Sequence, residues 1–81
     1  MAISKRIKAL LLETEKKQSD LQEVLEMSSK QSLSNKFANE RWSAADLVKV
    51  AEYCGCQLAF LMPDGKKIIL DAERKDKNED R

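Results

Sequence analysis

The chain has 81 residues, of which 42% are hydrophobic and 36% are charged, and its formal net charge is +1. This composition is typical of one small folded domain and excludes a disordered chain, and a domain of this size buries only about 60% of its unfolded surface, so a partner subunit can add to its stability. No apolar run approaches the ~20 residues of a membrane helix, and the apolar part of the N-terminus is too short for a signal peptide, so we expect a cytoplasmic protein.

The first third of the chain predicts two short amphipathic helices. The first covers residues 3–14, with basic residues on the side opposite its hydrophobic stripe. The second covers residues 18–26 and carries acidic residues in its first turns, where they suit the helix dipole. The side chains expected to be buried are Ile3, Ile7, Leu10 and Leu11 in the first helix and Leu21, Val24 and Leu25 in the second.

The segment MSSKQSLSNKFAN, residues 27–39, holds two lysines and no acidic residue, and it permits two interpretations. It is either a flexible linker or a third helix over residues 29–39 that begins at Ser28 or Ser29 as N-cap. Leu33 and Phe37 favour the helix, because side chains four residues apart lie on the same helix face and can be buried together.

A fourth helix is expected after the connection that contains Trp42. Ser43 is the predicted N-cap, and Asp46 occupies the capping-box position three residues later. Gly55 is expected to end this helix in the left-handed conformation. The predicted buried stripe is Leu47, Val50, Ala51 and Cys54. We interpret Trp42 as a core wedge between the third and fourth helices, or a lid on the following hairpin, rather than as a base-stacking residue.

The hydrophobic period changes after Gly55. Residues 57–62 and 66–70 read as two strands, and the turn residues Pro63-Asp64-Gly65 between them predict a β-hairpin. Residues 71–81 are charged apart from one alanine and one asparagine, which predicts a disordered tail. The chain is thus expected to comprise a helical bundle over residues 1–56, a hairpin for packing or dimerisation over 57–70, and the tail.

The residues that enzymes use are scarce in this chain. It has no histidine, and its two glycines are accounted for by a helix cap and a turn, so a phosphate-binding loop is not expected. The cysteines stand as C-x-C without the further ligands that a zinc site needs. We therefore expect no enzymatic activity, no metal and no cofactor.

Two short helices joined by a tight connection, with a helix on either side, form the helix-turn-helix plan. In that plan the second helix buries one side and presents the other to the DNA major groove. Gln and Asn can form paired hydrogen bonds with adenine, Lys can reach guanine or a phosphate, and Ser can contact either. The polar side of the predicted third helix offers Lys30, Gln31, Ser32, Ser34, Asn35 and Lys36.

Two segments also carry a family resemblance, namely QSDLQEVLEMSSKQSLSNKF and WSAADLVKVAEYCGCQLAFLMPDGKKI. They resemble the phage repressor/Cro-type (XRE-like) helix-turn-helix proteins, and more narrowly a group of small phage- and mobile-element-associated regulators. The resemblance covers residues 3–70. It implies a mainly α fold, a four-to-five-helix lambda-repressor-like bundle with a C-terminal β-hairpin. It also implies a sequence-specific regulator of transcription that binds double-stranded DNA.

The same resemblance implies roles for individual residues. It implies base contacts for Lys30, Gln31, Ser32, Ser34 and Asn35, and phosphate contacts for Gln18, Ser29, Lys36 and Arg41. The chain departs from the family in having Glu26 where the turn usually has Gly, and in having one extra residue between Met27 and Leu33. These departures leave open whether the recognition helix starts at Ser29 or one residue later, and so whether Lys30 or Gln31 meets the first base.

The hairpin suggests a homodimer. If one face of the hairpin covers the helices, the other exposes Ala59, Leu61 and Ile69, which a second copy could bury by pairing at a sheet edge or a sheet face. Two recognition helices in successive major grooves would then read a palindromic site. The alternative function is a protein-interaction module, an antitoxin or helical adaptor that uses the same fold without DNA.

Overall fold

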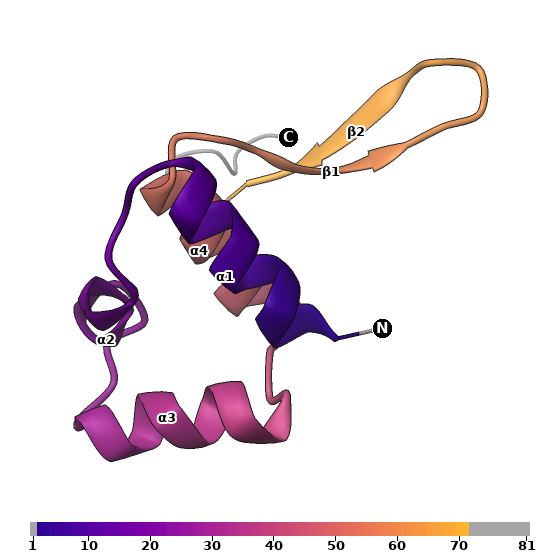
Figure 1. Ribbon diagram of the computed structural model, residues 1–81. Helices are drawn as coiled ribbons and strands as arrows, with labels where there is room; N and C mark the ends of the chain where they lie inside the picture. The colour runs from indigo at the N-terminus through magenta and orange to yellow at the C-terminus, as the bar shows by residue number, and fades with distance from the viewer. Residues whose placement is uncertain (1, 72–81) are drawn as a thin grey trace, which may run out of the picture.

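Four α-helices, one short 3-10 helix and a two-stranded hairpin make up residues 2–71, the part of the chain that the computed structural model describes (Figure 1). The fold is mainly helical with a small antiparallel hairpin, as predicted. The elements are α1 (Ile3–Glu13), η1 (Gln18–Asp20), α2 (Leu21–Val24), α3 (Lys30–Asn39), α4 (Ala44–Tyr53), β1 (Leu58–Leu61) and β2 (Lys67–Leu70).

One hydrophobic core joins the helices. Leu21 and Val50 are the most completely buried large side chains, and each such burial contributes about 1.5–3 kcal/mol. The other core members are Ile7, Leu11, Leu25, Leu33, Phe37 and Cys54. Most of the predicted stripe residues are therefore confirmed, whereas Ile3, Leu10, Val24 and Leu47 are only partly buried at its margin.

The starts of the third and fourth helices follow the predicted caps. The Ser29 side chain accepts a hydrogen bond from the Ser32 N–H at 3.1 Å, so Ser29 is the N-cap and α3 begins at Lys30. Ser43 and Asp46 form the predicted capping box before α4, each side chain accepting from the other residue's backbone N–H. Residues 30–39 are thus a helix and not a linker.

Each of the four α-helices is followed by a residue in the left-handed conformation. Gly55 follows α4 with φ 77°, as predicted, and the 2.9 Å hydrogen bond from the Cys56 N–H to the Ala51 carbonyl completes a Schellman turn. Glu15, Glu26 and Glu40 take the corresponding positions after α1, α2 and α3, with φ between 55° and 57°. A Cβ is disfavoured there, so these three turns are strained relative to Gly.

The second predicted helix needs two corrections. It starts as the 3-10 helix η1, and α2 stops at Val24 rather than at residue 26. The early stop follows from the left-handed turn at Glu26, because the Met27 N–H bonds to the Gln22 carbonyl at 2.8 Å and reverses the chain toward α3.

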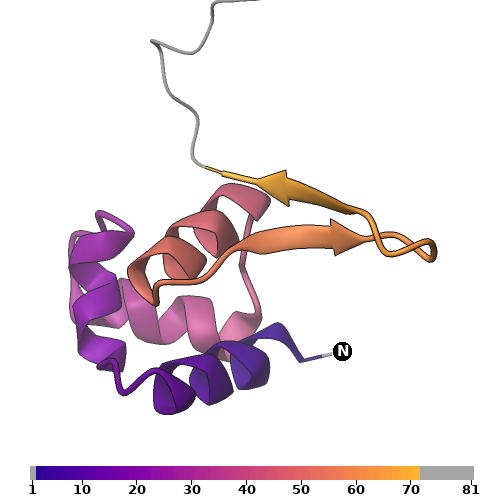
Figure 2. The same ribbon diagram turned by 90° about the horizontal axis from the view of Figure 1, so that it is seen from above.

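The hairpin has the predicted topology but covers less of the bundle than expected. Ala59 pairs with Ile69 and Phe60 with Ile68, and the arm projects sideways from the helices (Figure 2). Phe60 is 61% exposed and Ile68 is 56% exposed, so neither face of the outer half of the hairpin covers the helices. The two faces differ little in exposure, because only the base of the arm meets α4.

The predicted tail, except for Asp71, lies outside the described residues. Among residues 2–71, no helix combines the length and apolar character that crossing a bilayer requires.

Candidate nucleic-acid interface

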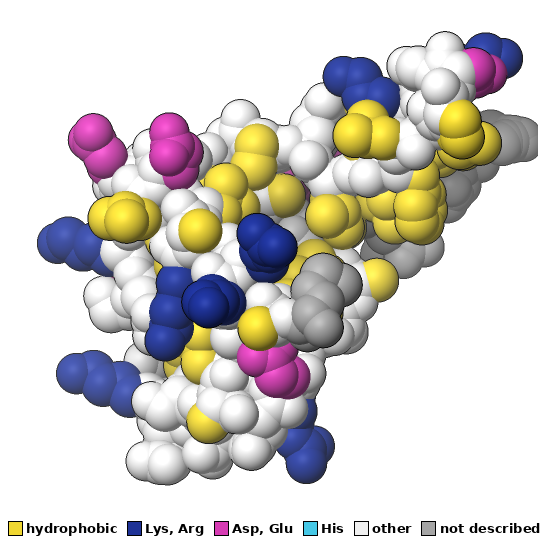
Figure 3. Space-filling view, turned by 45° about the vertical axis from the view of Figure 1, so that its right-hand side comes forward, with side chains coloured by type: hydrophobic (Ala, Val, Ile, Leu, Met, Phe, Trp, Pro, Cys, Tyr) yellow, Lys and Arg dark blue, Asp and Glu magenta, His cyan; other side chains and the backbone are white. Residues whose placement is uncertain are grey.

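The outward face of α3 is polar and lies at one end of the molecule, away from the hairpin (Figure 1). Leu33 and Phe37 point into the core, and the side opposite them carries exposed side chains at helical spacing. These are Gln31, Ser34, Asn35, Ala38 and Asn39. Lys30 is exposed too, but it stands three residues before Leu33, on the neighbouring side of the first turn. In Figure 3 this end shows mainly neutral polar surface, with lysine and arginine side chains at its margins.

Gln31 and Asn35 lie at the centre of this face. The Gln31 Nε2 donates to the Asn35 Oδ1 at 3.3 Å, which places the two amides side by side one helical turn apart. Each amide carries a donor and an acceptor, the pair that matches the edge of an adenine in the major groove. The structure therefore brings these two predicted residues together on one accessible surface.

Ala38 and Asn39 extend the same face and were not predicted. Ala38 is four residues after Ser34, and Asn39 is four residues after Asn35. Both are exposed, and a small methyl group such as that of Ala38 is the kind of surface that contacts the methyl of thymine. Helical spacing from the predicted residues was the signal that could have identified them.

Ser29 and Ser32 lie at the start of α3, and their side chains point toward each other rather than along the outward face. Their hydroxyls lie 3.1 Å apart, and both residues are half-buried. Ser29 already uses its oxygen as the helix cap. Ser32, which the prediction assigned to the base-contacting set, therefore has a hydrogen-bond partner within the molecule.

Lys36 is engaged within the molecule. Its Nζ forms an ion pair with Asp46 at 2.7 Å and donates to the Arg41 carbonyl at 2.8 Å, and only 16% of its side chain is exposed. The ammonium also lies over the Trp42 ring, 5.5 Å from its centroid. We therefore reassign Lys36 from the predicted phosphate contact to a brace across the α3–α4 turn.

Asp46 completes that brace. Burial disfavours its charged form, but hydrogen bonds from the Lys36 ammonium and the Ser43 N–H outweigh this effect and hold the pKa of Asp46 below its ordinary value. One carboxylate thus caps α4 and is bonded to a lysine of α3, so it links the two helices.

Gln18 and Arg41 lie in the segments before α2 and after α3. Gln18 is the exposed first residue of η1, which leads into the α2 that packs against α3. Arg41 is exposed in the turn after α3, and its side chain forms no ion pair with any residue between 2 and 71. Both residues predicted to contact phosphates are therefore exposed.

A buried serine that sequence reasoning missed holds the C-terminal end of α3. The Ser4 hydroxyl donates to the Phe37 carbonyl at 2.6 Å and accepts from the Trp42 Nε1 at 3.0 Å. Trp42 also meets Phe37 edge-on, with ring centroids 4.9 Å apart, so this tryptophan packs against the core through α1 and α3. Nothing local in the sequence marks Ser4, because its partners lie 33 and 38 residues away.

A tyrosine links η1 to the last helix. The Tyr53 hydroxyl, at the end of α4, donates to an Asp20 carboxylate oxygen at 2.5 Å. This hydrogen bond raises the pKa of Tyr53 above its ordinary value, because ionisation would place two negative charges side by side. The contact ties η1, and with it Gln18, to the bundle.

The chain has no counterpart among the known proteins with which it was compared: no family model, curated protein or solved structure matches it.

Proposed function

We propose that this protein is a sequence-specific regulator of transcription that binds double-stranded DNA and places α3 in the major groove. The observation that carries the proposal is the outward face of α3, an exposed, acid-free surface centred on the paired amides of Gln31 and Asn35. In this proposal α2 and α3 act as a helix-turn-helix of the lambda-repressor type, and the protein has no enzymatic role and no cofactor.

The dimensions and chemistry of α3 support this placement. Its ten residues span about 15 Å, and the groove is about 12 Å wide, so the outward face can lie along the base edges. Gln31 and Asn35 would read adenine, Lys30 would reach guanine or a phosphate, and Ser34 and Ala38 are small enough to permit close approach. Gln18, Ser29 and Arg41 would contact phosphates at the groove margins.

Recognition of DNA by α3 suggests a dimer, because one short helix contacts too few bases for high specificity. We propose that two copies associate through their hairpins, where Leu61 is 76% and Ile69 41% exposed, whereas Ala59 is half-buried. The two α3 helices would then read half-sites about 34 Å apart. Such a regulator acts in the cytoplasm, on the nucleoid, and its size and sequence resemblance favour a phage or mobile-element origin.

Selection of bound fragments from random duplex DNA tests the proposal directly. We expect enrichment of a palindromic sequence, together with weaker binding to arbitrary DNA that declines steeply as salt rises, since phosphate contacts release counterions. Absence of binding to DNA of every sequence at low salt would refute the proposal.

A second candidate function draws on the hairpin alone. Phe60, Leu61 and Ile68 are all more than half exposed, and such apolar arms are typical of protein-binding surfaces. A protein-interaction module, such as an antitoxin or adaptor, would use this arm and leave α3 without a nucleic-acid partner. The same low-salt binding measurement separates the two functions.

A further inference from the structure

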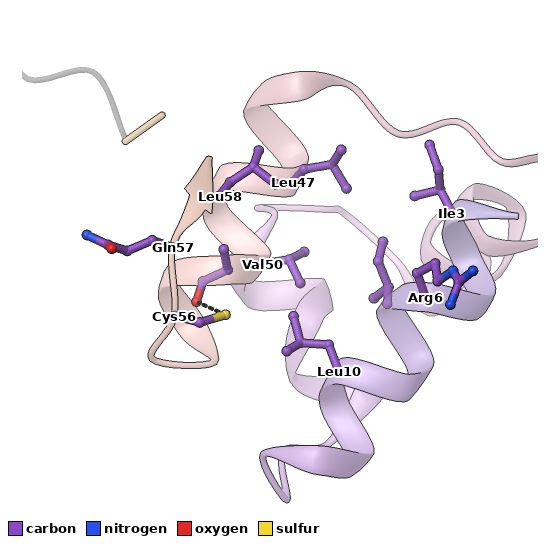
Figure 4. A pocket seen from close by; sticks show the side chains of 10 residues that line it. Ile3, Arg6, Leu10, Leu47, Val50, Cys56, Gln57 and Leu58 are labelled. Atoms are coloured by element: carbon purple, nitrogen blue, oxygen red, sulfur yellow. Dashed lines mark hydrogen bonds between the residues drawn. The ribbon is translucent and has the colours of Figure 1, made fainter. Parts of the chain in front are cut away.

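An apolar pocket of about 400 Å³ lies between α1, α4 and the base of the hairpin (Figure 4). Hydrophobic side chains from three elements converge on it, namely Ile3, Ile7, Leu10, Leu47, Val50 and Leu58. The polar residues at its edge are Arg6 and Gln57, and the Gln57 side chain points away. Small-molecule sites usually combine an apolar wall with several convergent polar groups, and this pocket has no such group of residues.

The hairpin carries the complementary surface. Alternation along the strands places Phe60 and Ile68 on the same face as Leu58, the residue that lines the pocket. Leu58 is half-buried at the base of the arm, whereas Phe60 and Ile68 extend past the helices. Figure 3 shows hydrophobic side chains gathered along this arm and beside it. Within residues 2–71 nothing covers the outer half of this face.

We propose that the α1–α4 pocket receives the hairpin of a second copy of this chain, with the partner's Phe60 and Ile68 seated in it. The inference rests on the dimer of the proposed function and specifies how that dimer is built. It makes Phe60 and Ile68, rather than the predicted Ala59, Leu61 and Ile69, the face that meets the partner's helices.

The adjacency of arm and pocket favours a second copy over an unrelated partner. Residues 56–58 both line the pocket and lead into β1, so a single two-fold rotation can bring each arm onto the other copy's pocket. Two arms and two pockets would be buried together, and a two-fold contact of this kind buries twice the surface that one arm in one pocket would bury. The α3 face lies away from both and stays accessible (Figure 1).

Cys56 supplies a built-in probe, because this free cysteine lines the pocket. In the variant Phe60→Cys, the new thiol would lie near Cys56 of the other copy. A disulfide to Cys56 of its own chain would leave a monomer on a denaturing gel, so only a link between two copies gives a dimer. Leu61→Cys is the matched control, one position along and on the opposite face of the arm.

Under mild oxidation at micromolar concentration, we expect Phe60→Cys to become mainly a reducible dimer whose linked peptides join positions 56 and 60. Wild-type protein and Leu61→Cys should remain mainly monomeric on a denaturing gel, and Phe60→Cys combined with Cys56→Ser should lose the cross-link. A cross-link that persists in the double variant, or one formed by Leu61→Cys alone, overturns the proposed seating.

Circular dichroism and low-salt DNA binding of the same variants separate the possible failures. A folded Phe60→Cys that binds DNA but does not link to Cys56 contradicts the pocket assignment and leaves the proposed function intact. If the wild-type protein does not bind DNA at low salt, the proposed function is refuted, whatever the cross-linking result.

Discussion

The Glu40 carboxylate caps the first turn of α1 by accepting a hydrogen bond from the Ile3 N–H at 2.9 Å, across 37 residues of sequence. The same oxygen accepts from the Ser4 N–H at 3.2 Å. The N-cap residue Ala2 has no side chain able to do this, so a residue beyond the end of α3 satisfies the start of α1. Glu40 is also one of the three glutamates with left-handed backbone. Its capping role explains why a glutamate stands at a position where the backbone conformation favours glycine.

Substitution by glycine separates the backbone strain of a left-handed glutamate from the capping of α1 by the Glu40 side chain. Glu26→Gly should raise the free energy of unfolding by about 0.5–1 kcal/mol, because relief of left-handed strain exceeds the extra entropy of glycine in the unfolded chain. Glu15→Gly should do the same. Glu40→Gly should instead destabilise the protein, since it removes the cap of α1. Urea denaturation measures all three variants, and a Glu40→Gly protein as stable as Glu26→Gly would contradict the capping role.

The Glu40 cap should also make stability depend on pH. Hydrogen bonds from the N–H of Ser4 and Ile3 lower the pKa of Glu40 from its ordinary value of 4.5, despite an opposing contribution from burial. The resulting stabilisation is complete above pH 4.5 and is lost as the pH falls through the lowered pKa of the folded state. The stability difference between wild type and Glu40→Gln should therefore shrink on acidification. Denaturation curves from pH 7 to pH 3 measure it, and a difference that does not vary with pH would argue against this linkage.

Local signals predicted the elements, and long-range contacts decided the remainder. Ser29, Ser43 and Gly55 were identified because a helix cap depends on a few neighbouring residues. The roles of Ser4 and Glu40 could not be found in this way, because each depends on backbone groups more than 30 residues distant.

The candidate site shows the same division. Helical spacing predicted that Gln31, Ser34 and Asn35 face outward, and they are exposed as expected. Lys36 and Ser32 were assigned from residue type and helical spacing, which cannot tell a partner within the molecule from an external one. Their partners, Asp46 and Ser29, decide the matter. The exposure of the hairpin faces could not be predicted for a related reason. Alternation shows which residues share a face of the hairpin but not what covers that face.

The Lys36–Asp46 pair should contribute to stability as a pair. A double-mutant cycle with Lys36→Met and Asp46→Asn should give a coupling of about 0.5–1 kcal/mol, at the upper end for surface ion pairs because both side chains are less than one-fifth exposed. Denaturation at low and at high salt measures this coupling. Additive effects of the two substitutions would show that the pair contributes nothing beyond its separate members.

The salt dependence of DNA binding distinguishes a lysine that braces the α3–α4 turn from a residue that contacts a phosphate. Arg41→Gln should lower the slope of log binding constant against log salt concentration by about 0.9, the value expected for one lost phosphate contact. Lys36→Met should leave this slope unchanged, provided the titration is done at a temperature where the variant is folded. A reduced slope for Lys36→Met would restore Lys36 to the phosphate-contacting set.

Asn35 should determine sequence preference, because its amide lies at the centre of the outward face of α3. In Asn35→Ala we expect discrimination at one base pair to fall by about 1–3 kcal/mol, with little change in binding to arbitrary DNA. Gln57→Ala is the control, because Gln57 is an exposed amide between α4 and β1, at the base of the hairpin and away from α3.

The Asn35 experiment has one complication that a further variant resolves. Removing the Asn35 side chain also releases the Gln31 amide, to which it is hydrogen-bonded. Gln31→Ala and the double variant should therefore show losses of discrimination that do not add, since each amide orients the other. Repeated selection from random DNA with each variant reports preference at every position. If Asn35→Ala weakens binding equally to all sequences and keeps the wild-type preference, Asn35 contacts the backbone and does not read a base.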